Sequence, residues 1–116
     1  MQYLMLIYSE ESKDPQPCSS EGEAFMNAYW KYTEEVKEKK LMLGSNALQP
    51  VSTATTVRLR DGKPVIADGP FAETKEQLGG YYLLDCKDLD EAIEYAAKIP
   101  SAAHGSIEIR PIMVFE

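Results

Sequence analysis

The sequence is poor in the residues that most often carry metals or cofactors. Its 116 residues include one histidine, two cysteines and one tryptophan. The two thiols, Cys18 and Cys86, lie far apart in the chain, so they cannot complete a closed metal site with one histidine. We therefore expect no metal and no cofactor. Two cysteines in a chain that can build an adequate core also indicate a reducing compartment, the cytoplasm.

Long hydrophobic runs are absent too, and basic residues are in deficit. The apolar residues 1–8 are too short to span a membrane and lack the basic segment of a signal peptide, so they predict a strand. The chain has 12 basic and 19 acidic residues, which gives a formal charge of −7. Nucleic acids and anionic membranes need basic surfaces, so both are excluded as partners.

What is present is typical of one globular domain covering residues 1–116. Hydrophobic residues make up 44% of the chain and charged residues 27%. Low-complexity runs, internal repeats and linkers are absent. A chain of this length buries about two-thirds of its unfolded surface, so a core forms without disulfides.

The periodicity of the apolar residues predicts six strands and two helices. A capping box, Ser20 to Glu23, opens the first helix, and Gly44 is its expected stop. Its expected apolar face is Phe25, Met26, Tyr29, Trp30, Thr33 and Val36. Asp88 caps a second helix that Pro100 ends, with Leu89, Ala92, Ile93, Ala96 and Ala97 on its apolar face. Strands are predicted at residues 2–8, 45–49, 55–60, 65–67, 81–86 and 106–115, with Asp61-Gly62 as a hairpin turn.

Without the hairpin at 55–67, the order of elements is β-α-β-β-α-β. This order predicts an α+β, ferredoxin-like antiparallel sheet with two helices on one face. The first strand is apolar throughout and the last is apolar on both sides, so one layer of helices leaves an apolar face open. We expect a homodimer that packs sheet against sheet, and the alternative is that the hairpin covers this face.

One segment, Asp68 to Gly80, combines three glycines and a proline with several ionisable side chains. It begins Asp-Gly-Pro-Phe and resembles the signature of the DGPF family, within the YCII-related proteins. The opening strand, the segments at 48–58 and the stretch 107–111 support the resemblance over nearly the whole chain. The resemblance implies a dimeric α+β barrel. Some relatives look like lyases or dehalogenase-like enzymes that use an early histidine with an aspartate, whereas this chain has only the late His104.

Asp68 and His104 are the candidate catalytic residues. Asp68 precedes Gly-Pro, so it either forms a turn through its carboxylate or acts as a base or ligand acceptor at a cleft. His104 is the one side chain that titrates near neutrality without help, and it lies in a loop where histidines are often solvated. A dyad of Asp68 and His104 needs long loops or a partner subunit, because the two loops lie at opposite ends of the sheet.

The candidate ligand-binding residues cluster in and around the signature segment. The charged cluster of Glu73, Lys75 and Glu76 is expected on a helical turn. It is either a solvated face or part of a fixed loop in which Lys75 contacts a carboxylate. Arg110 could bind a carboxylate ligand or pair with a neighbouring chain. Tyrosines on strands are packing residues whose hydroxyls can line a pocket. The full set is Phe71, Glu73, Lys75, Glu76, Tyr82 and Arg110.

Three functional hypotheses follow from these residues. The first is a dimer that binds a small organic molecule in a cleft near the signature segment. Its catalytic version is a lyase or isomerase in which Asp68 or His104 transfers a proton. The second is a non-catalytic sensor or protein-interaction module. The third is that the signature only fixes a crossover between strands.

Overall fold

The computed structural model of the chain describes residues 1–115. In this range, strands and α-helices follow one another as β1 (Gln2–Ser9), α1 (Ser20–Glu38), β2 (Met42–Ala47), β3 (Thr55–Arg60), β4 (Lys63–Asp68), β5 (Gln77–Asp85), α2 (Leu89–Ala97) and β6 (Ser106–Pro111). Short 3₁₀ turns lie at Glu11–Lys13, Val51–Thr53 and Pro100–Ala103. None of the described helices is long and apolar enough to cross a membrane.

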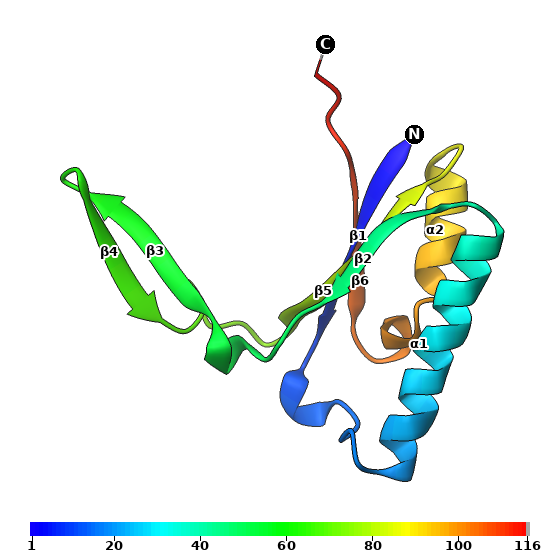
Figure 1. Cartoon of the computed structure of the whole chain (residues 1–116), viewed down its shortest axis with the longest axis horizontal. Coiled ribbons are helices and arrows are strands. Elements are labelled where there is room, and N and C mark those ends of the chain that lie inside the picture. The colour runs from blue at the N-terminus through cyan, green and yellow to red at the C-terminus, as the bar shows by residue number, and fades with distance from the viewer. Residues whose placement is uncertain (116) are drawn as a thin grey trace.

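Four strands form one antiparallel sheet in the order β2-β5-β1-β6, and β3 and β4 form a separate hairpin. Both helices lie on the same side of the four-stranded sheet (Figure 1). The α+β class and the β-α-β-β-α-β order are therefore as predicted. The first strand is also internal, because β1 pairs with β5 on one side and β6 on the other.

The core forms where alternate strand residues meet the helices. Tyr3, Met5 and Ile7 of β1 are buried, whereas Leu4 and Leu6 between them are only half-buried. The buried set continues through the other elements as Tyr32, Val36, Tyr82, Leu84, Cys86, Ala92, Tyr95, Ala96 and Ile99. A strand places successive side chains on opposite faces. Leu4 and Leu6 therefore lie on the sheet face that no helix covers.

The ends of α1 differ from the predicted ends. Its N-cap is Ser19, whose Oγ accepts a hydrogen bond from the Gly22 amide at 2.9 Å, so the predicted Ser20 is the first helical residue. The helix ends at Glu38, and Lys40 adopts a left-handed φ of 61°. Gly44, the predicted stop, lies inside β2. A lysine has taken the left-handed position that the sequence pattern assigns to glycine.

Two predicted helix faces are also wrong in part. Met26 and Trp30 of α1 are 50% and 61% exposed, and Tyr32 is buried instead. In α2, Leu89 and Ile93 are half exposed, whereas Tyr95 is in the core. Met26 and Trp30 border a cavity between α1 and the sheet, whereas Tyr29 packs against the core.

The observed ends of three strands differ from the predicted ends, and for β6 the end is determined by its pairing with β1. The predicted strands 45–49 and 81–86 are observed at Met42–Ala47 and Gln77–Asp85. The predicted strand 106–115 ends at Pro111. Its partner β1 begins at Gln2, whose carbonyl accepts the last bond from the Ile112 amide at 2.9 Å. Residues 113–115 have no strand left to pair with, and they are exposed.

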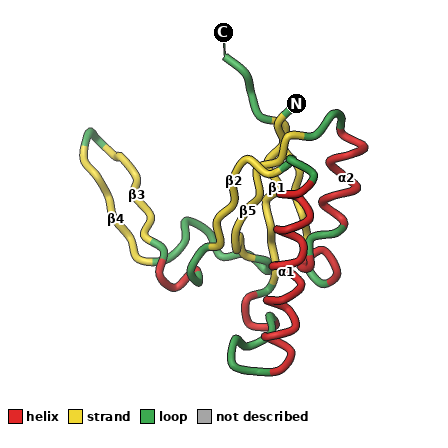
Figure 2. The backbone as a smooth tube through the Cα atoms, turned by 45° about the vertical axis from the view of Figure 1, so that its right-hand side comes forward, coloured by secondary structure: helices red, strands yellow, loops and turns green. Residues whose placement is uncertain are grey.

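The β3–β4 hairpin stands apart from the sheet, on the side opposite to the helices (Figures 1 and 2). Its predicted Asp61-Gly62 turn is present, with φ of 52° and 75° at the two residues. Left-handed φ at both central residues is the geometry that joins twisted antiparallel strands. The signature segment leads from this hairpin back into β5.

Candidate functional site

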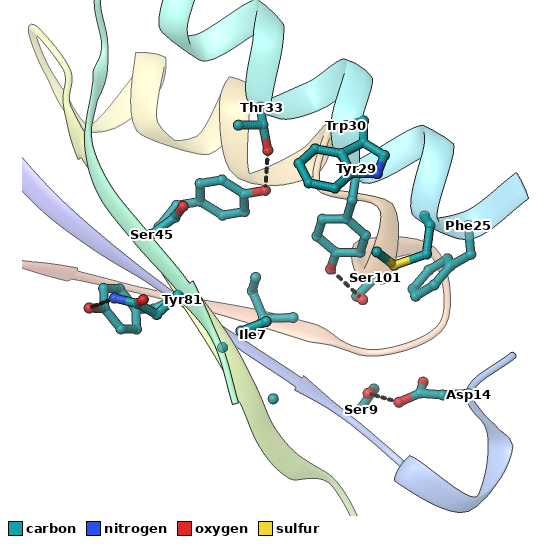
Figure 3. A pocket seen from close by; sticks show the side chains of 16 residues that line it. Ile7, Ser9, Asp14, Phe25, Tyr29, Trp30, Thr33, Ser45, Tyr81 and Ser101 are labelled. Atoms are coloured by element: carbon teal, nitrogen blue, oxygen red, sulfur yellow. Dashed lines mark hydrogen bonds between the residues drawn. The ribbon is translucent and has the colours of Figure 1, made fainter. Parts of the chain in front are cut away.

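A cavity of about 310 Å³ lies between α1 and the sheet. We call it the α1 pocket (Figure 3). Its wall combines aromatic side chains of the helix with strand residues from β1, β2 and β5. The residues that line it are Ile7, Ser9, Asp14, Phe25, Met26, Tyr29, Trp30, Thr33, Ser45, Asn46, Ala47, Gly79, Gly80, Tyr81, Tyr82 and Ser101. This wall includes no lysine, arginine or histidine.

The aromatic wall comes from successive turns of α1. Phe25 and Tyr29 are one helical turn apart, and their rings meet edge to face with centroids 5.2 Å apart. Trp30, which is 61% exposed, borders the same cavity beside them. Ring faces and edges of this kind suit a flat apolar or conjugated ligand.

One end of the α1 pocket carries a carboxylate that is held by two partners. Asp14 Oδ2 accepts a hydrogen bond from the Ser9 hydroxyl at 2.9 Å, and Oδ1 lies 3.2 Å from His104 Nε2. Ser9 is buried and takes the inward position that follows Tyr3, Met5 and Ile7 along β1. Ser9, the last inward-facing residue of β1, thus fixes the position of the Asp14 carboxylate.

The connectivity of these three groups determines what chemistry they can do. In a nucleophilic triad the histidine accepts the serine proton and the aspartate orients the histidine. Here Asp14 lies between Ser9 and His104, so His104 is not placed to take the serine proton. His104 borders a second hollow, which Phe25 and Lys13 also line. The arrangement connects a carboxylate in the α1 pocket to an imidazole that is partly exposed to solvent.

Hydroxyl pairs line the remaining polar parts of the wall. Tyr29 and Ser101 are hydrogen-bonded at 2.6 Å, and Thr33 and Tyr82 at 2.7 Å. Burial raises the pKa of Tyr29 and of Tyr82 above the ordinary tyrosine value, although the hydrogen bonds to Ser101 and Thr33 oppose the rise. Both phenols therefore keep their protons.

The last two residues of the signature segment, Gly79 and Gly80, belong to the strand side of the wall. A Cβ on Gly80 would lie 2.7 Å from the Asn46 carbonyl oxygen, whereas a Cβ on Gly79 meets its first neighbour at 4.0 Å. Glycine at position 80 lets β5 and β2 approach closely. This is a structural reason for the second glycine of the pair.

The two candidate catalytic residues lie in different surroundings. Asp68 is the exposed last residue of β4, opposite Thr55 in the hairpin. His104 has Asp14 as its carboxylate partner. The hairpin projects away from the sheet, whereas His104 lies in the loop between α2 and β6 (Figure 1).

The candidate ligand-binding residues fall into separate groups. Phe71 and Glu73 line a hollow of about 620 Å³ at the base of the hairpin, together with Tyr8, Val51 and Leu78. Tyr82 belongs to the α1 pocket. Arg110 is exposed on β6 opposite Leu4, on the face without helices.

The charged cluster of the signature is not on a helical turn, because residues 70–76 form bends and irregular chain. Glu76 Oε1 accepts a hydrogen bond from the Ser106 hydroxyl at 2.8 Å, which ties the segment to the start of β6. Lys75 is exposed and makes no ion pair with any described residue. Within residues 1–115, no three acidic, histidine or cysteine side chains are grouped so as to hold a metal ion.

Comparison with known proteins places the chain in a family. The family model of the YCII-related domain matches residues 1–116. The chain belongs to the YCII-related family. An uncharacterised protein of Rhizobium meliloti is 40% identical over 123 residues, which cover 100% of this chain and 95% of that protein.

A solved structure shares the fold of this YCII-related protein. It is the 5-chloro-2-hydroxyhydroquinone dehydrochlorinase of Burkholderia phenoliruptrix, in complex with 2,5-dihydroxybenzoquinone. The superposition has a TM-score of 0.53, covers 97% of this chain and 94% of that one, and the sequences are 13% identical. The likeness supports the α+β fold class.

Sequence reasoning missed Asp14 and Ser9 in this YCII-related protein. Asp14 lies in a polar loop between Lys13 and Pro15, and nothing local distinguishes it from a solvated loop residue. Ser9 did carry a signal, because it continues the inward alternation of β1 with a hydroxyl. A polar residue at the end of a buried row needs a hydrogen-bond partner, and here Asp14 is that partner.

Proposed function

We propose that this YCII-related protein binds a small, uncharged, hydroxylated ring compound in the α1 pocket. The observation that carries the proposal is the composition of the wall. Aromatic rings and hydroxyls surround one carboxylate, and no cationic side chain lies among the lining residues. A negatively charged ligand would meet Asp14 without a compensating charge, whereas a ligand hydroxyl can donate to it.

The fold neighbour supports the ring and the hydroxyl groups of this ligand class. That protein was solved with 2,5-dihydroxybenzoquinone, a single ring with hydroxyl groups. A cavity of about 310 Å³ lies at the lower end of the range for small-molecule sites, so it suits one ring.

Trp30 provides the test, because it is the one tryptophan of the chain and it borders the α1 pocket. Hydroquinone should quench its fluorescence saturably, and benzoate, which carries a negative charge, should not. Asp14→Asn removes the charge-assisted acceptor and should weaken hydroquinone binding about tenfold. Asp90→Asn, an exposed change in the first turn of α2, is the matched control. Equal affinity for benzoate would refute the proposed ligand class.

The same titration separates the α1 pocket from a cleft at the signature segment. Asp68→Asn should leave hydroquinone affinity within about twofold, because Asp68 is exposed on the hairpin. A loss of affinity in Asp68→Asn with none in Asp14→Asn would move the site to the hollow beside Phe71 and Glu73.

The Asp14–His104 pair favours proton transfer as a second candidate function. Asp14 borders the α1 pocket and His104 borders a separate hollow, so a proton taken from a ligand can pass to solvent through His104. Such chemistry belongs to lyases and isomerases.

His104→Gln tests this function, since it removes the imidazole and leaves the residues that line the α1 pocket unchanged. Hydroquinone affinity should stay within about threefold. Deuterium incorporation from solvent into carbon positions of a bound hydroxylated ring, followed by NMR, should slow by about a hundredfold. Exchange at the parent rate in His104→Gln would exclude the histidine from the reaction.

We also propose that the protein forms a homodimer through the sheet face that lacks helices. Leu4, Leu6 and Leu83 give this face an apolar surface, and each is half-buried in the single chain. An isologous pair would bury both copies of the surface. Light scattering at micromolar concentration should give about twice the mass of one chain. A monomer at every concentration would refute the dimer.

A further inference from the structure

The β3–β4 hairpin has almost no support from its own chain. Eleven of its twelve strand residues are exposed, and Thr56 is the half-buried exception. The hydrogen bonds at its base join its own two ends: the Gly69 amide donates to the Ala54 carbonyl at 2.7 Å, and Thr56 Oγ1 donates to the Gly69 carbonyl at 2.8 Å. An isolated two-stranded hairpin is marginally stable in water.

The pairing register divides this hairpin into two unlike faces. Residues directly opposite each other in an antiparallel pair lie on the same face. Val57 opposite Ile66 and Leu59 opposite Pro64 give one apolar face. Arg58 opposite Val65 and Arg60 opposite Lys63 give a mainly cationic face. Val57, Leu59 and Ile66 are 62%, 66% and 67% exposed, so the apolar face is open in the single chain.

The position of the hairpin identifies what can cover this face. Hairpin and uncovered sheet face lie on the same side of the molecule, away from α1 and α2 (Figures 1 and 2). A second copy seated on the sheet face through Leu4 and Leu6 is therefore within reach of the hairpin. The radius of gyration, 16.2 Å, exceeds the roughly 13 Å of a compact domain of this length, as expected of a projecting arm.

Charge also favours a second copy as the occupant. The hairpin, residues 55–68, has three basic and two acidic side chains, whereas the whole chain has 12 basic and 19 acidic ones. A slightly cationic arm is attracted to the acidic body of another copy.

We propose that the β3–β4 hairpin is an arm that each subunit lays on its partner, with Val57, Leu59 and Ile66 packed against the second copy. This inference rests on the proposed homodimer and adds a second contact surface to it. The hairpin then acts in assembly, and it contributes no residue to the α1 pocket.

The test compares two neighbouring residues of β4 that point to opposite faces. Ile66→Lys places a charge on the apolar face, and Val65→Lys places the same charge on the cationic face. Sedimentation over a range of concentrations should show a dimer dissociation constant raised at least about thirtyfold in Ile66→Lys and less than about threefold in Val65→Lys. Both residues are exposed in the single chain, so circular dichroism should show a retained fold.

The outcomes separate the arm from the dimer itself. A parent protein that is monomeric throughout overturns both proposals. A parent dimer that persists in Ile66→Lys overturns the arm and leaves the sheet contact. If Ile66→Lys and Val65→Lys raise the dimer dissociation constant equally, the proposal that the apolar face contacts the partner is overturned. If Ile66→Lys is unfolded, hydrogen exchange of the parent decides: the β3 and β4 amides should exchange more slowly at concentrations that favour the dimer, and concentration-independent exchange overturns the arm.

Discussion

At the scale of single residues, the site depends on one residue that the sequence does not single out and on two that it does. Asp14 is chemically prominent in the structure, since it joins Ser9 to His104, but its loop context hides it. Gly79 and Gly80 are prominent in the sequence, but their role is the geometry of the wall rather than chemistry.

The adjacent glycines give a matched pair of variants. Gly80→Ala forces a methyl group against the β2 backbone and should destabilise the fold by about 1–3 kcal/mol. Gly79→Ala has open space, so it should be neutral or slightly stabilising through the unfolded chain. Urea denaturation of both variants measures the difference. Equal stability of the two would show that β2 yields to the added methyl.

At the scale of elements, the sequence predicted what depends on local periodicity. The strand predicted at residues 2–8, the Asp61-Gly62 turn and the Asp88 cap of α2 are all confirmed, because each depends on neighbours in the chain. Met26 and Trp30 were misplaced, since helical spacing cannot tell a core from the rim of a cavity. The end of β6 was also misjudged, because it depends on where β1 begins.

The corrected cap of α1 can be tested directly. Ser19→Ala removes the acceptor for the Gly22 amide and should cost about 1 kcal/mol of stability. Ser20→Ala, one residue along, should change stability by less than about 0.5 kcal/mol, because Ser20 is the first helical residue. Thermal melting of both variants decides between the two caps, and a larger loss in Ser20→Ala would restore the predicted one.

At the scale of the whole molecule, buried phenols make the fold sensitive to alkali. Burial raises the pKa of Tyr29, Tyr32 and Tyr82 above the usual value of 10.0. A raised pKa means that the folded chain keeps protons that the unfolded chain releases. The stability from these groups is complete below pH 10 and is lost as the pH rises further.

The free energy of unfolding should therefore fall above about pH 10, by up to about 1.4 kcal/mol per pH unit for each tyrosine. The melting temperature should fall with it. Tyr32→Phe should melt lower at neutral pH, because it loses the hydrogen bond to the Tyr95 carbonyl, and yet lose less on going to alkaline pH. Tyrosinate absorbance should rise with unfolding. Ionisation of all tyrosines in a still-folded chain would contradict the raised pKa values.

The internal position of β1 has a consequence for synthesis of the chain. β1 leaves the ribosome well before β5 and β6, the two strands with which it pairs. Until about two-thirds of the chain exists, this apolar strand has both hydrogen-bonding edges unpaired, a state that invites association with other chains. Folding is therefore a late event, completed when the C-terminal strand closes the sheet on the N-terminal one.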